Sequence, residues 1–309
     1  MHVLVLGAGA LGGYYGGRLQ QGGADVTFLV RAKRRAQLAR DGLRIESGHG
    51  NFHQPVKTAS AADAISHADV VLLTCKAYDL PGAIEAIRPA VGPKTAVLPL
   101  LNGLSHMETL NAAFSCQRVL GGLAKIQAAM TPEGVIQTFN DWRYVTFGEQ
   151  SGEMTARIDD LHRHFAPTPV IAKAVPNIMA AMWEKLVHLA TAAGATSLMR
   201  ASIGEIARTA HGSQIMIDLL EANARVAALE GHQVSSPFMH EFRTLLANPQ
   251  SEYSTSMLRD IERHGPIEAD HIHGFMLDKV RKHGLDDRVH LIVLTHLKAY
   301  EQRRAAGRL

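Results

Sequence analysis

The chain has 309 residues, of which 46% are hydrophobic and 20% charged, and its formal net charge is +3. This is the composition of a globular protein with room for two domains, and so small a charge gives no reason to expect nucleic acid as a partner. The two cysteines, Cys75 and Cys116, argue against a disulfide framework, and we expect both thiols to be buried. No stretch qualifies as a membrane span and the first strand begins at residue 2 or 3, so we expect a cytoplasmic protein.

The N-terminal stretch has the pattern of a dinucleotide-binding unit. In chain order its expected parts are the buried strand Val3–Leu6, the G-x-G-x-x-G glycines Gly7, Gly9 and Gly12, the helix Leu11–Gln20 and the strand Val26–Val30. Such glycines allow a tight turn, close approach of a pyrophosphate to bare backbone, and close packing of helix on strand. A helix N-terminus also attracts phosphate, so we predict that Ala10 and Leu11 bind the cofactor together with the three glycines.

Arg31 follows the second strand, at the position where an acidic residue would bind the ribose hydroxyls of NAD. A guanidinium there can bind a 2′-phosphate through two hydrogen bonds. Lys33, Arg34 and Arg35 come next with no acid among them, so the pattern favours NADP(H). Solvated basic residues at the start of a helix, or a targeting signal, would account for the charges, but neither explains an arginine at this strand end.

Strands alternate with helices up to about residue 172, which predicts a parallel, doubly wound sheet and a Rossmann-type NADP-binding domain over residues 1–172. Further β segments are expected at Leu43–Ile45, Phe52–Val56, Asp69–Thr74, Thr95–Leu101, Val119–Ala129, Gly134–Thr138 and Arg143–Phe147, the last three closing the sheet. Helices are expected at Ala59–Ser66, Leu80–Ala90, Ser105–Phe114 and Glu153–Phe165.

Beyond residue 172 the apolar residues recur at helical spacing. Examples are Met179, Met182, Leu186 and Leu189, then Ile215, Leu219, Val226 and Leu229, then Ile272, Phe275, Met276 and Val280. Gly231 and Gly284 stand where helix C-caps belong. We therefore predict an all-helical second domain over residues 173–309.

Two polar residues follow strands of the predicted sheet, where ligands of such sheets bind. Lys76 follows the strand ending at Thr74, and Asn102 follows the strand ending at Leu101. Either side chain could contact the nicotinamide end of the cofactor. The structural alternatives are a solvated loop lysine and an ordinary Asn-Gly turn.

Three polar residues of the helical part are further candidates. Lys185 stands among apolar residues, Glu268 follows Pro266 at an expected helix start, and Ser256 lies in a cluster suited to an N-cap. Each has an ordinary structural explanation when taken alone, since most helix lysines are solvated. The two H-x-H pairs have no cysteine or acid clearly at ligand spacing, so we predict no metal site.

Taken together, these residues resemble the ketopantoate reductase (2-dehydropantoate 2-reductase) family over nearly the whole chain. The matching segments are GAGALGGYYGGRL with Arg31, CKAYD with Lys76, LNGL with Asn102, WEKL with Lys185, and SMLRDIERHGPIEADHIHGFML with Ser256 and Glu268. The last segment is the most specific, because several polar residues must keep one spacing.

The resemblance implies reduction of 2-dehydropantoate to pantoate by NADPH, a step of pantothenate biosynthesis. It implies that Lys185 is the general acid that protonates the developing alkoxide and that Glu268 orients its ammonium. It further implies that Ser256 and Asn102 hold the substrate, and that Lys76 and Asn102 line the nicotinamide side. A small 2-oxo acid is the expected partner, and a homodimer is compatible with the apolar helix faces.

The chain departs from the family pattern on the lysine helix. The family has substrate-binding asparagines four and eight residues after the lysine, where this chain has Leu189 and Ala193. Tyr253 likewise replaces an asparagine three residues before Ser256. Each missing hydrogen bond is worth roughly 0.5–1.5 kcal/mol, so a bulkier or more apolar 2-oxo acid is an alternative substrate. A non-catalytic NADP-binding regulatory protein is a second alternative, although it would need neither the lysine nor the glutamate.

Overall fold

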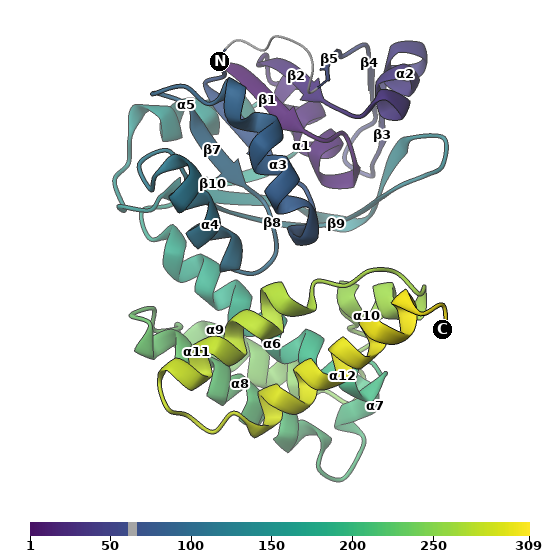
Figure 1. Cartoon of the computed structure of the whole chain (residues 1–309), viewed down its shortest axis with the longest axis vertical. Coiled ribbons are helices and arrows are strands. Elements are labelled where there is room, and N and C mark those ends of the chain that lie inside the picture. The colour runs from purple at the N-terminus through teal and green to yellow at the C-terminus, as the bar shows by residue number, and fades with distance from the viewer. Residues whose placement is uncertain (61–66) are drawn as a thin grey trace. The chain divides into compact units, whose positions relative to one another are not determined.

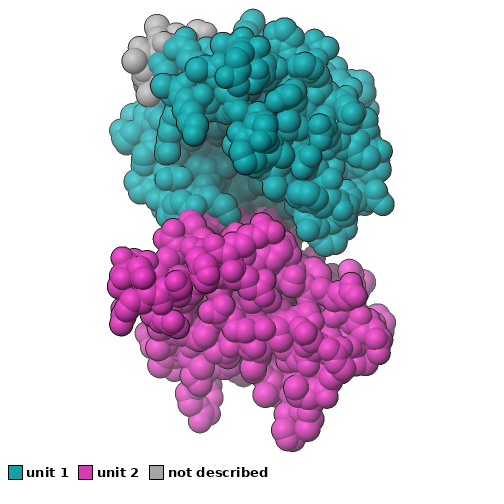
Figure 2. All heavy atoms as spheres, turned by 90° about the vertical axis from the view of Figure 1, so that its right-hand side faces the viewer, with its two compact units in different colours: residues 1–101, 106–178 teal, residues 102–105, 179–309 magenta. Residues whose placement is uncertain are grey.

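The computed structural model of the chain describes residues 1–60 and 67–309. They form two compact units, each drawn in its own colour in Figure 2. Unit 1 contains residues 1–101 and 106–178, and unit 2 contains residues 102–105 and 179–309. The predicted boundary after residue 172 falls within a strand, β10 (Ile171–Ala174). The binding of cofactor by one domain and of substrate by the other remains a prediction.

Unit 1 is built on a parallel sheet with β1 at its centre (Figure 1). In sheet order the strands are β5 (Lys57–Ala59), β2 (Asp25–Leu29), β1 (His2–Leu6), β6 (Val70–Leu73) and β7 (Ala96–Pro99), and all neighbours are parallel. Both faces of such a sheet are covered, which is why all four residues of β6 are apolar and buried. The strand order reverses between β1 and β6, and open α/β sheets bind ligands at that switch point.

Helix α1 (Ala10–Gln21) packs between this sheet and a second one. It contacts β1, β2 and β6 of the first sheet. In the second sheet it contacts β3 (Leu43–Glu46), β8 (Leu120–Met130) and β9 (Val135–Glu149). The glycines of α1 permit this close packing: a Cβ at Gly16 would lie 2.7 Å from Cε1 of Phe28. Tyr14 and Tyr15 of the same helix are fully buried, so the core of unit 1 is centred on α1.

The three β segments expected to close the parallel sheet belong instead to a second, mixed sheet. In this sheet β9 pairs antiparallel with β8 and in parallel with β3 and β10, while β4 (Phe52–Gln54) pairs antiparallel with β3. An isolated parallel bridge between Val97 and Val119 joins the two sheets.

Strand β9 is one long strand where the sequence predicts two. Residues 139–142 stand outside its ladder with β8, and the ladder resumes on either side of them. A side-chain hydrogen bond connects the two strands in this interrupted stretch: Nδ2 of Asn140 donates to Oε1 of Gln127 at 3.0 Å. A bulge of this kind interrupts pairing without ending the strand, which explains the mistaken division.

Of the remaining helices of unit 1, α3, α4 and α5 agree closely with the predicted ones, whereas α2 (Ala32–Asp41) is an additional helix in the basic segment after Arg31. The predicted helix Leu80–Ala90 ends in a 3-10 turn, and α5 begins three residues late because Thr155 is its N-cap. The helix expected over Ala59–Ser66 lies largely outside the described residues, and Ala59 itself ends β5. The bounds are α2 (Ala32–Asp41), η1 (Ala77–Asp79), α3 (Leu80–Ile87), η2 (Arg88–Ala90), α4 (Ser105–Phe114) and α5 (Ala156–Phe165).

Unit 2 is helical, so the predicted fold class is confirmed. Gly231 and Gly284 have φ values of +87° and +63° just beyond α8 and α11, as expected of residues that follow a helix C-terminus. The helices are α6 (Ile178–Met199), α7 (Ile203–Ala207), α8 (Gly212–Leu229), α9 (Ser236–Leu246), α10 (Ser256–Glu262), the π-helical turn η3 (Asp270–Gly274), α11 (Phe275–Lys282) and α12 (Arg288–Ala305).

Two further observations concern the surface. Among residues 1–60 and 67–309, no helix combines the length and hydropathy that a bilayer crossing requires. The expected burial of both cysteines is wrong for Cys116, which is exposed, and is met only in part by Cys75, which is half-buried. It follows Ser115, whose φ of 73° ends α4 and turns the chain along the surface.

Candidate active site

The fingerprint loop joins the end of β1 to the start of α1. Gly7 has a φ of +88°, which favours glycine, and its N–H donates to the carbonyl oxygen of Leu29 at 2.9 Å. A Cβ at Gly12 would collide with the Gly7 carbonyl and would lie 2.5 Å from Oγ1 of Thr74. Gly9 is the N-cap residue of α1, and a Cβ built there would point into open space. No side chain at this position is hydrogen-bonded to the N–H groups of the first helical turn. This bare helix N-terminus is suited to a pyrophosphate.

Arg31 is the N-cap residue of α2, just beyond the end of β2. Its side chain is 93% exposed, and its Nη2 lies 3.9 Å from Oδ1 of Asp79, which is also exposed. An exposed ion pair this long contributes little to stability, so the guanidinium can exchange it for a phosphate at small cost. The predicted role of Arg31 as a 2′-phosphate ligand is compatible with this geometry and remains a prediction.

Arg34 has a structural role that the sequence analysis did not single out. Its Nε donates to the carbonyl oxygen of Ala8 in the fingerprint loop at 3.0 Å, and its Nη1 donates to the carbonyl oxygen of Gly134 at 3.1 Å. Burial lowers the pKa of this guanidinium. Arg34 therefore fastens the fingerprint loop to the turn between β8 and β9. No local sequence signal indicated this role, because Ala8 and Gly134 are distant from Arg34 along the chain.

Lys76 is exposed and directly precedes η1, at the carboxyl end of β6. The strand places it at the edge of the sheet where ligands of this fold class bind. It belongs to unit 1, whereas Asn102 belongs to unit 2. Their shared role beside a nicotinamide therefore remains a prediction.

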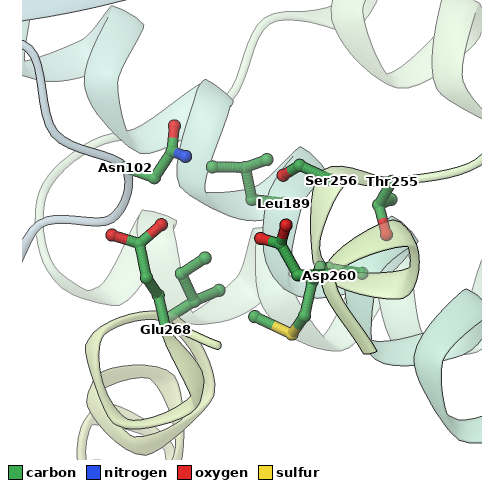
Figure 3. A pocket seen from close by; sticks show the side chains of 9 residues that line it. Asn102, Leu189, Thr255, Ser256, Asp260 and Glu268 are labelled. Carbon is green, nitrogen blue, oxygen red and sulfur yellow. The ribbon is translucent and has the colours of Figure 1, made fainter. Parts of the chain in front are cut away.

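Unit 2 contains a pocket that brings together several of the predicted residues (Figure 3). Its space free of protein atoms is about 310 Å³, part of it open to solvent. The lining residues are Asn102, Leu189, Ala193, Thr255, Ser256, Met257, Asp260, Glu268 and Ile272. Figure 3 shows the Glu268 carboxylate turned toward the loop that carries Asn102, and the Asp260 carboxylate on the side of Ser256. The pocket thus has polar groups at two places and an apolar surface between them.

Helix α6 supplies the apolar wall. Leu189 and Ala193 are one turn apart on this helix, and both line the pocket. The sequence comparison identified these two positions as departures, and the structure places both at the pocket. Tyr253 is not among the lining residues, and its hydroxyl is hydrogen-bonded to Nε2 of His188 at 2.8 Å.

Lys185 lies on α6 one turn before Leu189, on the same face of the helix. Burial lowers its pKa from 10.5 to about 8, and the negative charge of Glu268 opposes that shift. A lysine with a pKa near neutrality can both give and take a proton, as a general acid or base must. Strongly shifted groups beside a pocket are typical of active sites.

The start of α10 is fixed by buried hydrogen bonds below Ser256. Thr255 is the N-cap of α10, and its Oγ1 accepts from the N–H of Leu258 at 3.3 Å. The same hydroxyl lies 2.9 Å from Oγ1 of Thr196 on α6, and both threonines are buried. This link holds Ser256 and Asp260, which are one turn apart on α10, at the pocket. Asp260 was not predicted as a lining residue, although it belongs to the R-D pair of the family segment.

Two family models match the chain. The model described as "Ketopantoate reductase PanE/ApbA" matches residues 3–152, and its C-terminal counterpart matches residues 177–301. The chain belongs to the ketopantoate reductase family. It is therefore an oxidoreductase of that family, and the expectation from the sequence is confirmed at this level.

This member of the ketopantoate reductase family is similar both to an uncharacterized oxidoreductase and to a relative that is named for its reaction. An "Uncharacterized oxidoreductase YkpB" of Bacillus subtilis (strain 168) is 36% identical, covering 98% of this chain and 100% of the relative. A 2-dehydropantoate 2-reductase of Archaeoglobus fulgidus is 30% identical, covering 97% of each.

Among solved structures, 2-dehydropantoate 2-reductase from Methylococcus capsulatus superposes with a TM-score of 0.88 at 26% identity, covering 99% of this chain and 98% of that one. A D-mandelate dehydrogenase solved with NADH and anilino(oxo)acetate has a TM-score of 0.85 at 20% identity, covering 99% of this chain and 100% of that one. The latter likeness concerns the fold alone.

Proposed function

We propose that this chain transfers hydride from NADPH to the keto carbon of a 2-oxo acid, with Lys185 as the general acid. The observation that carries the proposal is the position of Lys185: it is not itself a lining residue, but it is half-buried on α6, one turn before the lining residue Leu189, and its charge interacts with that of Glu268, another lining residue. The pKa of this lysine is lowered to about 8 by desolvation. Glu268 lines the same pocket as Asn102 and Ser256. The first substrate to test is 2-dehydropantoate, whose product would be pantoate.

The residues of unit 1 fit a dinucleotide. The Gly12 position has no room for a Cβ and the Gly9 position faces open space, so bare backbone is available to a pyrophosphate. Arg31, being nearly free of the rest of the protein, would bind the 2′-phosphate that distinguishes NADPH from NADH. When bound, the cofactor supplies the hydride. Lys76 and Asn102 would line its nicotinamide side.

The residues of unit 2 would manage the substrate and the proton. The Lys185 ammonium would hydrogen-bond the keto oxygen and transfer its proton there as the carbon receives hydride, which leaves a neutral amine and a hydroxyl group. Glu268 would orient the ammonium through their opposite charges. Ser256 and Asn102 would hold the acid by hydrogen bonds, since both line the pocket with polar side chains.

A panel of 2-oxo acids tests the proposal. The decrease of NADPH absorbance would be followed with 2-dehydropantoate, pyruvate, 2-oxoisovalerate, 2-oxoisocaproate and phenylglyoxylate, and each assay would be repeated with NADH. We expect saturable turnover with at least one acid and a preference for NADPH. Tight NADPH binding without turnover of any acid would instead indicate a regulatory protein.

The wall of the pocket favours a second candidate within the same reaction. Leu189, Ala193, Met257 and Ile272 offer apolar surface to the substrate, whereas 2-dehydropantoate carries a hydroxyl beyond its two methyl groups. The methyl groups suit this wall, but the hydroxyl would have to reach Ser256, Thr255 or Asp260. A 2-oxo acid with an entirely apolar side chain would leave no polar group unpaired. Higher kcat/KM for 2-oxoisocaproate or phenylglyoxylate than for 2-dehydropantoate would identify this candidate.

A further inference from the structure

The loop that follows β7 carries Asn102 into the pocket. Residues 102–105 cluster with the helical unit 2, although the strand before them and most of the helix after them belong to unit 1. Asn102 lines the pocket together with Glu268 and Ile272 (Figure 3). The position of its amide therefore depends on what holds this loop against unit 2.

The backbone of the loop lies directly against η3. Gly103 has a φ of +83°, and a Cβ there would lie 2.5 Å from the carbonyl oxygen of His271 and 3.7 Å from Cγ1 of Ile272. A larger residue would thus meet backbone rather than a movable side chain. The fit between loop and η3 requires glycine at this position.

A side-chain hydrogen bond reinforces the same contact. Oγ of Ser105, the first residue of α4, lies 3.0 Å from Nδ1 of His271, and the bond is partly buried. On the other side of η3, Lys298 donates to Oδ2 of Asp270 at 2.7 Å. The π-helical turn is thus anchored to α12 and contacts the Asn102 loop through His271. Such turns often occur at functional sites.

We propose that His271 and Ser105 are positioning residues that hold the Asn102 amide at the substrate pocket. This inference rests on the proposed function, because it assigns Asn102 a substrate contact. Neither residue lines the pocket, so neither would touch the substrate. They act through the loop: the bond to His271 fixes Ser105, and Ser105 fixes the backbone that carries Asn102 three residues earlier.

The test combines Ser105→Ala, His271→Leu and Asn102→Ala in steady-state assays with NADPH and the best 2-oxo acid of the panel. We expect Ser105→Ala and His271→Leu each to lower kcat/KM about 3- to 10-fold, the loss expected for one hydrogen bond, mainly through a higher KM for the acid. His271→Asn keeps a polar atom near the Nδ1 position and should restore most of the loss. Ser213→Ala, in the first turn of α8, is the matched control for the serine substitution.

Combining the substitutions distinguishes a loss of Asn102 positioning from a general loss of protein stability. The Ser105→Ala/His271→Leu double variant should be no worse than either single variant. Ser105→Ala should also have no further effect in an Asn102→Ala background. Losses that multiply in that background, or an unchanged kcat/KM in Ser105→Ala, would overturn the inference.

A readout without turnover keeps this test separate from that of the proposed function. If the wild-type protein reduces no 2-oxo acid, the proposed function fails, and hydrogen exchange still tests the link. We expect amides of residues 102–105 to exchange about 3- to 10-fold faster in His271→Leu than in the wild-type protein or in Ser213→Ala. Exchange at the wild-type rate would show that His271 does not hold the loop.

Discussion

The fingerprint loop of unit 1 and the pocket of unit 2 are built in different ways. The loop is a single β–α connection, and the surface proposed to bind the cofactor is mostly backbone at Gly7 and Gly9, while the buried Gly12 allows the helix to pack closely. The pocket draws its side chains from four separate segments: residue 102, α6, the start of α10 with its N-cap, and residues 268–272, which lead into η3. A backbone site recognises a chemical group shared by many ligands, whereas a side-chain site determines which reaction occurs and on which substrate.

This difference predicts which measurement each substitution affects. Changes in unit 1 should alter cofactor affinity, and changes around the pocket should alter turnover or substrate choice.

Lys185→Ala should lower kcat about 10²- to 10⁴-fold, the usual contribution of a general acid, and should leave the Kd for NADPH nearly unchanged. The reason is that the proposed function assigns Lys185 to the proton transfer and no part of the cofactor to it. Steady-state rates and fluorescence titration of NADPH measure the two effects. Lys282→Ala on α11 is the control, since that lysine is 58% exposed and pairs with Glu230. Equal losses in rate and cofactor affinity would place Lys185 in the cofactor site instead.

Arg31→Ala should raise the KM for NADPH about 10- to 100-fold, the loss expected when hydrogen bonds to a charged group disappear. The KM for NADH should stay nearly constant, because NADH has no 2′-phosphate. Arg40→Ala, at the other end of α2, serves as the control: its guanidinium pairs with Asp41. If the variant kept the wild-type preference for NADPH, the phosphate assignment would be wrong.

The pH dependence of reduction should follow the protonation of Lys185. Reduction needs the ammonium form, so kcat/KM should be level below pH 8 and should fall about tenfold per pH unit above it. Oxidation of the hydroxy acid needs the neutral amine and should rise over the same range. In Glu268→Gln, loss of the carboxylate that raises the lysine pKa should move both profiles to lower pH. A profile unaffected by this substitution would contradict the coupling between the two residues.

Leu189→Asn should change substrate preference by a smaller factor. It places an amide on the apolar wall, so the kcat/KM ratio of 2-dehydropantoate to 2-oxoisocaproate should rise about 3- to 10-fold. Leu229→Asn, at the exposed end of α8, controls for the general cost of asparagine in a helix. An unchanged ratio would mean that α6 does not contact the substrate side chain.

The parts of the molecule that depend on local sequence could be predicted from the sequence alone. The strand, fingerprint and helix at the N-terminus are specified by neighbouring residues, and Gly12 has the tight environment that its motif requires. The helices of unit 2 were equally accessible through their apolar spacing. By contrast, the second sheet could not be predicted from local sequence. In this sheet β9 of the β8–β9 hairpin pairs with β3 and β10, and both partners are distant from the hairpin along the chain.

The pocket could be predicted only in part. The family resemblance indicated Asn102, Ser256 and Glu268, and all three are lining residues, but their roles remain predictions. Two contacts escaped the sequence analysis because they join residues far apart along the chain. They are the bond of Arg34 to the Ala8 carbonyl and the bond of Ser105 to His271. Nothing in the local sequence specifies such pairs.

Isotope transfer tests the central claim most directly. NADPH deuterated at the transferred C4 position would be incubated with the enzyme and the best 2-oxo acid, and the product analysed by mass spectrometry. We predict a 2-hydroxy acid one mass unit heavier, with deuterium on C2, and far less of it from Lys185→Ala in the same time. A product without deuterium, or no product from any acid of the panel, would contradict hydride transfer to the keto carbon.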